Sequence, residues 1–189
     1  DLLVGGTGGS WTTGNAYIFY GGSIVTETAS GADVSYGGEG ANNYFGHSLA
    51  TGDFNADGRA DFVVSAYGYS SNTGRMYIFY NDGSYPSMTA RADVIITGEG
   101  TNNYFGDVIS VGDFSADGKT DLAVGAYGYA TNTGKTYIFY SQNGQVNTDK
   151  SIAGESASNF AYALVAGDFN ADGKTDLIAG APNYSTYTG

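Results

Sequence analysis

The stretch GDFNADGRADFVVSAYGYSSNTGRMYIFY (residues 52–80) recurs as GDFSADGKTDLAVGAYGYATNTGKTYIFY (residues 112–140), and 19 of the 29 positions are identical. The two copies begin 60 residues apart. A third copy of the acidic part, GDFNADGKTDLIAGAP, begins at Gly167. Self-similarity at a fixed period is the signature of a repeat architecture, so this repeat governs the fold of the whole chain.

Each period contains four short segments of β character, exemplified by residues 47–54, 61–67, 75–80 and 92–98. Gly, Asn, Asp and Ser bound these segments, and none of them has a sustained helical period. Four strands in one period predict an all-β fold with one antiparallel sheet per repeat, which is how a β-propeller blade is built. The alternatives are a stacked β-solenoid, whose periods are usually shorter, and a β-sandwich, which seldom repeats so closely.

The repeats divide the chain approximately into residues 47–106 and 107–161, with partial repeats at 1–46 and 162–189. Residues 1–14 have the same phase as the last 14 residues, so Asp1 occupies the ninth position of an acidic loop. A propeller typically has four to eight blades. We therefore expect residues 1–189 to be a propeller segment of a larger array, completed by blades of the same longer chain or by identical subunits.

Composition excludes several classes of function. The net charge is −12 and the seven Lys and Arg residues are scattered singly, so the basic surface that nucleic-acid binding requires is missing. No apolar run is long enough to span a membrane, and the chain has no cysteine for disulfides or thiolate metal sites. Because His47 is the one histidine and no nucleophile, phosphate or dinucleotide motif is present, we expect no enzymatic activity.

The acidic part of the repeat predicts a metal site. It places oxygen-bearing side chains at loop positions 1, 3, 5 and 9, with Gly at position 6 for a sharp turn. Hard oxygen ligands in this number suit Ca²⁺, which takes six to eight, and the main-chain carbonyl of position 7 can add one more. Mg²⁺ would require a stricter octahedron with more water.

An EF-hand is ruled out because position 12 is Val64, Val124 or Ala179 where an EF-hand needs Glu, and because strands flank the loop. A plain acidic β-turn would explain one copy, but all three copies keep their oxygen side chains. The predicted ligands are Asp53, Asn55, Asp57, Asp61 and the main-chain oxygen of Arg59 in the first acidic loop (residues 53–61); Asp113, Ser115, Asp117, Asp121 and the main-chain oxygen of Lys119 in the second (113–121); and Asp168, Asn170, Asp172, Asp176 and the main-chain oxygen of Lys174 in the third (168–176). Three bound Ca²⁺ ions would change the formal charge from −12 to −6.

The repeat resembles the FG-GAP repeats of integrin α-subunit β-propellers. The Phe-Gly pair is present as Phe45-Gly46 and Phe105-Gly106, and the Gly-Ala-Pro triplet stands at residues 180–182. The resemblance implies a propeller, seven-bladed in integrins, with Ca²⁺ in the loops between the first and second strands of a blade. It also implies an extracellular or cell-surface module for adhesion or recognition.

In that family, ligands contact the opposite face of the propeller, which the loops between strands 2 and 3 and between blades form. On this chain these loops hold five aromatic candidates for binding a protein or glycan: Trp11, Tyr67, Tyr69, Tyr127 and Tyr129. The alternative is that these rings pack between blades, and this packing is the stronger expectation for Phe45 and Phe105.

The leading functional hypothesis is therefore a calcium-stabilised extracellular propeller module for adhesion or recognition. One alternative is a structural repeat protein that assembles head to tail into a filament or oligomer, because heterologous interfaces that do not close continue indefinitely. The other alternative is an accessory propeller of a larger secreted enzyme.

Overall fold

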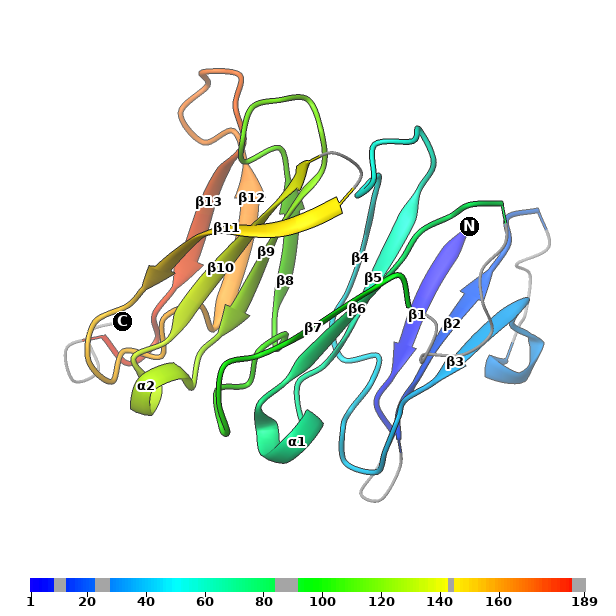
Figure 1. Cartoon of the computed structure of the whole chain (residues 1–189), viewed down its shortest axis with the longest axis horizontal. Coiled ribbons are helices and arrows are strands. Elements are labelled where there is room, and N and C mark those ends of the chain that lie inside the picture. Colours follow the sequence, from blue (N-terminus) through cyan, green and yellow to red (C-terminus); the bar gives the residue numbers. More distant parts are fainter. Residues whose placement is uncertain (9–12, 23–27, 84–91, 143–144, 185–189) are drawn as a thin grey trace.

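The computed structural model describes residues 1–8, 13–22, 28–83, 92–142 and 145–184. Four of the five aromatic candidates are among these residues, whereas Trp11 lies outside them. The structure is all-β, as expected, and its strands form four separate antiparallel sheets that stand side by side (Figure 1). Within each sheet, strands adjacent in the sequence are also adjacent in space. Each full sheet is therefore one blade built from one repeat.

The strands fall into sheets as follows. The first sheet contains β1 (Leu2–Gly6), β2 (Asn15–Phe19) and β3 (Val34–Gly37). The second contains β4 (Leu49–Gly52), β5 (Asp61–Ala66), β6 (Arg75–Phe79) and β7 (Val94–Thr97). The third contains β8 (Ile109–Gly112), β9 (Asp121–Ala126), β10 (Lys135–Gln142) and β11 (Gln145–Ala153), and the fourth contains β12 (Ala163–Gly167) and β13 (Asp176–Gly180).

Neighbouring sheets contact each other through their first strands, since β4 lies beside β8 and β8 lies beside β12. The four sheets do not close into a ring, so the described chain forms part of a propeller (Figure 1). This arrangement of sequential antiparallel sheets distinguishes the fold from a stacked solenoid and from a two-sheet sandwich.

The hydrophobic core consists of layers between successive sheets. Between the first and second sheets, Tyr36 packs with Phe62 and Phe79 at ring-centroid distances of 5.3 and 4.7 Å. Phe45 and Phe105 are buried, which confirms the expectation that these rings pack between blades. All six residues of β5 and of β9 are buried because each of these strands has a sheet on both faces. This two-sided burial explains why 61–67 reads as a nearly continuous apolar run.

The segments α1 (Tyr69–Asn72) and α2 (Tyr129–Asn132) are single turns whose central residues have left-handed backbone angles. Ser70 and Ser71 have φ values of 49° and 57°. Such angles cost about 1–2 kcal/mol per residue for L-amino acids. The turn is held by a hydrogen bond that Gly74 N donates to Tyr69 O, at 3.1 Å, and by one that Asn102 N donates to Ser71 O, at 3.0 Å.

The remaining helical element in the described ranges is the short 3₁₀ turn η1 (Ala29–Gly31). Among the described residues, none of the helical segments has the length and apolar character needed to cross a membrane.

Candidate functional site

The three acidic loops lie at one end of the sheets, and α1 and α2 lie at the other (Figure 1). Each acidic loop joins the first and second strands of its sheet: β4 to β5, β8 to β9, and β12 to β13. The structure therefore brings all the predicted ligands of one loop into one hairpin and places the three hairpins on the same edge of the molecule. The four described aromatic candidates, Tyr67, Tyr69, Tyr127 and Tyr129, lie in or beside α1 and α2 on the opposite edge.

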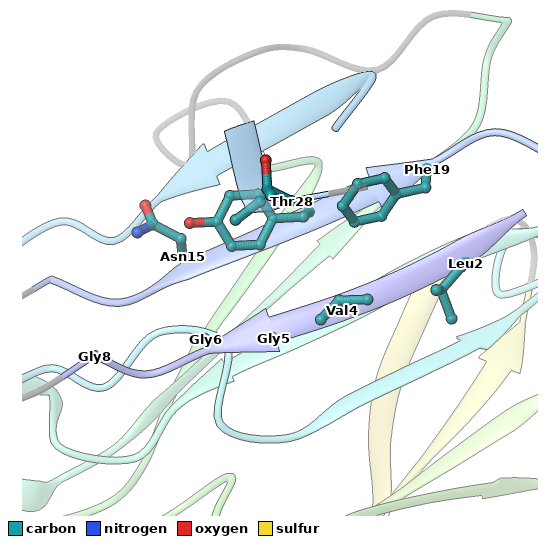
Figure 2. Close-up of a pocket in the computed structure, with 10 residues that line it drawn as sticks. Leu2, Val4, Gly5, Gly6, Gly8, Asn15, Phe19 and Thr28 are labelled. Atoms are coloured by element: carbon teal, nitrogen blue, oxygen red, sulfur yellow. The ribbon is translucent and has the colours of Figure 1, made fainter. Parts of the chain in front are cut away.

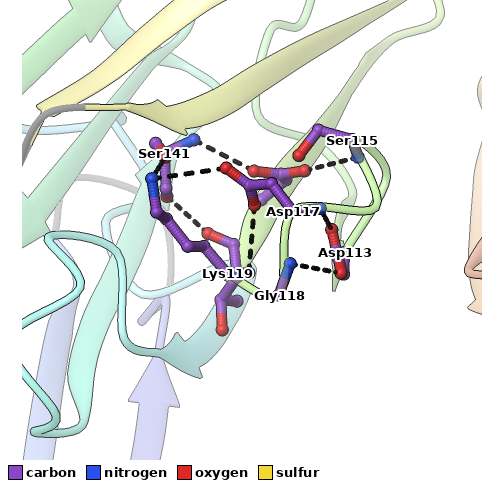
Figure 3. A network of polar contacts seen from close by, with 8 residues as sticks. Asp113, Ser115, Asp117, Gly118, Lys119 and Ser141 are labelled. Atoms are coloured by element: carbon purple, nitrogen blue, oxygen red, sulfur yellow. Dashed lines mark hydrogen bonds and ion pairs between the residues drawn. The ribbon is translucent and has the colours of Figure 1, made fainter.

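Backbone N–H groups fold each loop around its first carboxylate. In the second acidic loop, Asp117 N and Gly118 N donate to the two oxygens of Asp113 at 3.0 and 2.8 Å, and Lys119 N donates to Asp117 Oδ1 at 3.1 Å (Figure 3). The same pattern recurs in the other two loops. The glycine at position 6 has φ of 83–86° in all three loops, as the sharp turn requires.

The aspartates at position 9 anchor the loops to the sheets. Asp61 is buried, and its two carboxylate oxygens accept N–H groups from Phe54 at 2.9 Å and from Asn81 at 2.8 Å. Asp121 is also buried, and accepts N–H groups from Ser115 at 2.9 Å and Ser141 at 3.0 Å. Burial raises the pKa of both carboxyl groups, although the N–H donors act in the opposite direction. Each oxygen that accepts one hydrogen bond retains a lone pair for a further partner.

Ser115, at position 3 of the second loop, provides a test of whether a cation fits. Its Oγ is buried and makes no well-aligned hydrogen bond in the described part of the chain, but it lies close enough to the Asp117 and Asp121 carboxylates to act as a donor that lowers the pKa of each. A buried hydroxyl oxygen among carboxylates is an environment that a hard cation would satisfy. The donor set of the second loop therefore fits Ca²⁺.

The side chain of Lys119 brings a positive charge next to the carboxylates of the second acidic loop. Its Nζ lies 3.3 Å from Asp117 Oδ2 and donates to Ser141 O at 3.4 Å (Figure 3). Partial desolvation pushes the pKa of Asp117 upward, but the Lys119 N–H and ammonium groups outweigh it, so the pKa is lowered. In the described ranges, no three His, Asp or Glu side chains already converge as a preformed metal cluster. The loop carboxylates are instead occupied by backbone N–H groups.

The tyrosines on the opposite edge form two stacked pairs. Tyr67 stacks on Tyr44 at a centroid distance of 5.0 Å, and Tyr127 stacks on Tyr104 at 4.7 Å. Tyr67 and Tyr104 lie 6.2 Å apart, which links the two pairs across neighbouring blades. Burial, followed by the negative charge of Asp107, raises the pKa of Tyr127 to about 12. These contacts use ring faces that a ligand would otherwise stack against.

The other two candidates, Tyr69 and Tyr129, lie against cations. The Arg75 guanidinium carbon is 3.6 Å from the centre of the Tyr69 ring, and Lys135 Nζ is 4.6 Å from the centre of the Tyr129 ring. Each cation also pairs with a glutamate of the preceding connection: Arg75 with Glu39 at 2.9 Å and Lys135 with Glu99 at 2.7 Å. All four described tyrosine candidates are partly exposed, so part of each side chain remains accessible.

Sequence reasoning missed one contact on this edge. His47 Nε2 lies 3.2 Å from Asp107 Oδ1, and the His47 ring meets the Tyr67 ring edge-on at 4.4 Å. Both residues precede the first strand of a blade, at equivalent positions of the repeat. Because the three repeats carry His47, Asp107 and Tyr162 at this position, no repeated motif signalled the contact.

Comparison with known proteins agrees with this geometry. The family model described as FG-GAP repeat matches residues 45–79, 105–139 and 160–189, and each match contains one acidic loop. The chain is 36% identical over 154 residues to the phosphatidylinositol-glycan-specific phospholipase D of Rattus norvegicus, covering 72% of this chain and 18% of that protein. It is 34% identical over 185 residues to integrin alpha-PS5 of Drosophila melanogaster, covering 90% of this chain and 18% of that protein.

Integrin alpha-8 of Gallus gallus is 27% identical over 211 residues, with 96% of this chain and 19% of that protein covered. The chain thus spans less than a fifth of the length of the relatives it matches. The three repeat matches, the sheet built from each repeat and the hairpin position of the acidic loops together assign the family: the chain belongs to the FG-GAP repeat family.

Proposed function

We propose that this chain is a calcium-stabilised, extracellular β-propeller module that serves adhesion or recognition. Each acidic loop would hold one Ca²⁺ through its side chains at positions 1, 3, 5 and 9 and its main-chain carbonyl at position 7. The observation that carries the proposal is the enclosed Ser115 Oγ, which faces the Asp117 and Asp121 carboxylates of the second acidic loop and makes no well-aligned hydrogen bond in the described chain. A divalent cation would offset the mutual repulsion of the loop carboxylates.

The same loops support an extracellular location. Extracellular calcium modules commonly bind at about 10⁻⁴ to 10⁻³ M, a range that loads them outside cells. The integrin and phospholipase relatives share these repeats. We therefore place the module outside the cell or on its surface.

The edge opposite the acidic loops is the proposed recognition face. Beside the tyrosine pairs, a hollow of about 430 Å³ lies between residues 101–104 and 128–132. Its side chains are neutral amides, hydroxyls and an aromatic ring, from Asn102, Asn103, Tyr104, Thr131 and Asn132 among others. Neutral hydrogen-bonding groups next to aromatic edges suit a polar protein or glycan ligand.

The outer faces of the end sheets are the proposed contacts with further blades. Leu2 on β1 is 46% exposed, whereas Phe62 and Leu122, at the same repeat position on β5 and β9, are 2% and 0% exposed. The exposed face of the first sheet borders a hollow of about 570 Å³ lined by Leu2, Val4, Tyr17 and Phe19 among others; Leu2, Val4 and Phe19 are labelled in Figure 2. A further blade would cover this face as the first sheet covers the second.

A second candidate function is that of an accessory propeller in a larger secreted enzyme. The similarity to phosphatidylinositol-glycan-specific phospholipase D, over 72% of this chain, favours it. In that case the acidic loops would keep the same stabilising role, and the catalytic groups would belong to another part of the longer protein.

Thermal unfolding tests the calcium assignment. At a hundredfold excess of Ca²⁺ over Kd, each site stabilises the folded state by about 2.7 kcal/mol. We expect the unfolding temperature of the chain to rise strongly from chelator to millimolar Ca²⁺ and to rise much less with Mg²⁺. An unchanged unfolding temperature in chelator would refute the assignment.

A further inference from the structure

The phenylalanine at position 2 of each acidic loop has the same local sequence but a different exposure in each blade. The heptapeptide GDFNADG occurs at residues 52–58 and again at 167–173. Phe54 in the first copy is 0% exposed, whereas Phe169 in the second is 53% exposed. Phe114, in the second acidic loop, is partly buried.

The exposure of these rings follows the size of the next sheet. The sheet after Phe54 has four strands and the sheet after Phe114 has two, while no described strand follows the sheet of Phe169. Phe54 belongs to the core layer that also contains Leu122 and Phe139 of the next sheet, and Phe114 packs on the layer that contains Leu164. The ring at position 2 therefore inserts between its own blade and the following one.

The ring and a threonine of the next acidic loop both pack closely against the same glycine. A β-carbon on Gly52 would lie 3.1 Å from Phe54 Cε1 and 2.5 Å from Thr120 Cγ2 of the second acidic loop. The arrangement repeats one blade later, where a β-carbon on Gly112 would lie 3.4 Å from Phe114 Cε1 and 2.5 Å from Thr175 Cγ2. The methyl group of the threonine at position 8 of each loop, Thr120 or Thr175, thus packs against the glycine that precedes the loop of the previous blade.

This contact joins the proposed ligands of two loops. Thr120 stands between Lys119 and Asp121, and Phe54 stands between Asp53 and Asn55. Phe54 N also donates to the position-9 carboxylate of its own loop at 2.9 Å. A cation that orders the second acidic loop would hold Thr120 in place. Thr120 packs against Gly52, which in turn packs against the Phe54 ring, so its position would also restrain the start of the first loop.

We propose that cation binding in consecutive acidic loops is cooperative, and that the Phe–Gly–Thr contact between neighbouring blades transmits the coupling. The inference rests on the proposed calcium sites. Ordering the shared contact costs entropy once, so the second ion to bind meets a loop that is already partly ordered. By linkage, each of two neighbouring ions raises the affinity of the other by the same factor.

Calorimetric Ca²⁺ titration of the full chain tests the coupling. All variants carry Asp172→Ala, which disables the third loop and leaves two sites. The affinity of the first loop is measured with the second loop intact and with it disabled by Asp117→Ala. We expect binding to the first loop to be about fivefold tighter or more when the second loop is intact, at the low end of typical coupling factors.

Two matched substitutions then locate the coupling. Thr120→Ser removes only the methyl group that packs against Gly52. In this variant, the Ca²⁺ affinity of the first loop should be nearly the same whether the second loop is intact or disabled. Thr175→Ser makes the same change one blade later and should leave the coupling between the first and second loops intact. Equal first-loop affinities with and without the second loop would overturn the coupling while leaving the calcium proposal standing. Absence of heat from every loop would overturn both.

Discussion

Asp61 Oδ1 accepts the backbone N–H of Asn81 at 2.8 Å, which ties the acidic loop to the chain just after the third strand of the same blade. The same 20-residue spacing recurs between Asp121 and Ser141, which lies near the end of β10, at 3.0 Å, and between Asp1 and Gly21, which follows β2, at 2.7 Å. The aspartate at position 9 is thus a structural anchor as well as a proposed calcium ligand. The two roles are separable by experiment.

Asp61→Ala should destabilise the chain even in chelator, because the buried N–H group of Phe54 and the partly buried N–H group of Asn81 lose their acceptor. Leaving a buried donor unsatisfied costs about 1–3 kcal/mol. Asp57→Ala, in the exposed part of the same loop, should lower stability only when Ca²⁺ is present. Urea unfolding of both variants with and without chelator measures the difference. Equal losses for both variants in chelator would contradict the anchoring role.

Asp57→Ala, Asp117→Ala and Asp172→Ala should each remove one calcium site and leave the other two able to bind, since each loop belongs to its own sheet. Calorimetric stoichiometry should fall from three ions to two in every case. Arg59→Ala is the matched control, because position 7 contributes its carbonyl and the Arg59 Nη1 donates to Asn81 O at 3.2 Å. Loss of a site in Arg59→Ala but not in Asp57→Ala would show that the ligand assignment is wrong.

Phe105→Ala should be among the most destabilising single substitutions. Phe105 is 1% exposed and meets Tyr137 edge-on at 5.2 Å. Removing a buried phenylalanine from a packed core typically costs about 3–5 kcal/mol. Ile95→Ala on β7, which removes an exposed apolar side chain, should change the unfolding free energy by about 0.5 kcal/mol or less. Similar losses for the two variants in denaturant titrations would show that the interblade layer is not the main core.

Alkaline pH should destabilise the chain through the tyrosine pairs. The pKa of Tyr127 is raised from 10.0 to about 12, so the stabilisation linked to its neutral form is complete below pH 10 and is lost as the pH rises through about 12. The tyrosinate absorbance should therefore rise in more than one step. Tyr127→Phe should remove part of the later step, and a single step near pH 10 in the folded protein would contradict the prediction.

The residue pattern alone was sufficient to predict the all-β fold, the sheet in each repeat and the membership of the family. These features are local and periodic: the alternation of β-rich segments with turn residues sets the strands, and repetition sets the blades. The oxygen positions of the acidic loops were also readable, since the spacing of ligands within one hairpin is a property of nine consecutive residues. Their occupation by Ca²⁺ stays a prediction.

The tertiary structure decided what depends on distant neighbours. The stacking of Tyr127 on Tyr104 and the contact between His47 and Asp107 join residues of different strands and connections, for which the sequence carries no local signal. The identical heptapeptides around Phe54 and Phe169 show the reason most directly, because one ring is fully buried and the other is half exposed. Local sequence fixes the hairpin that carries the ring, whereas burial depends on whether another sheet packs against it.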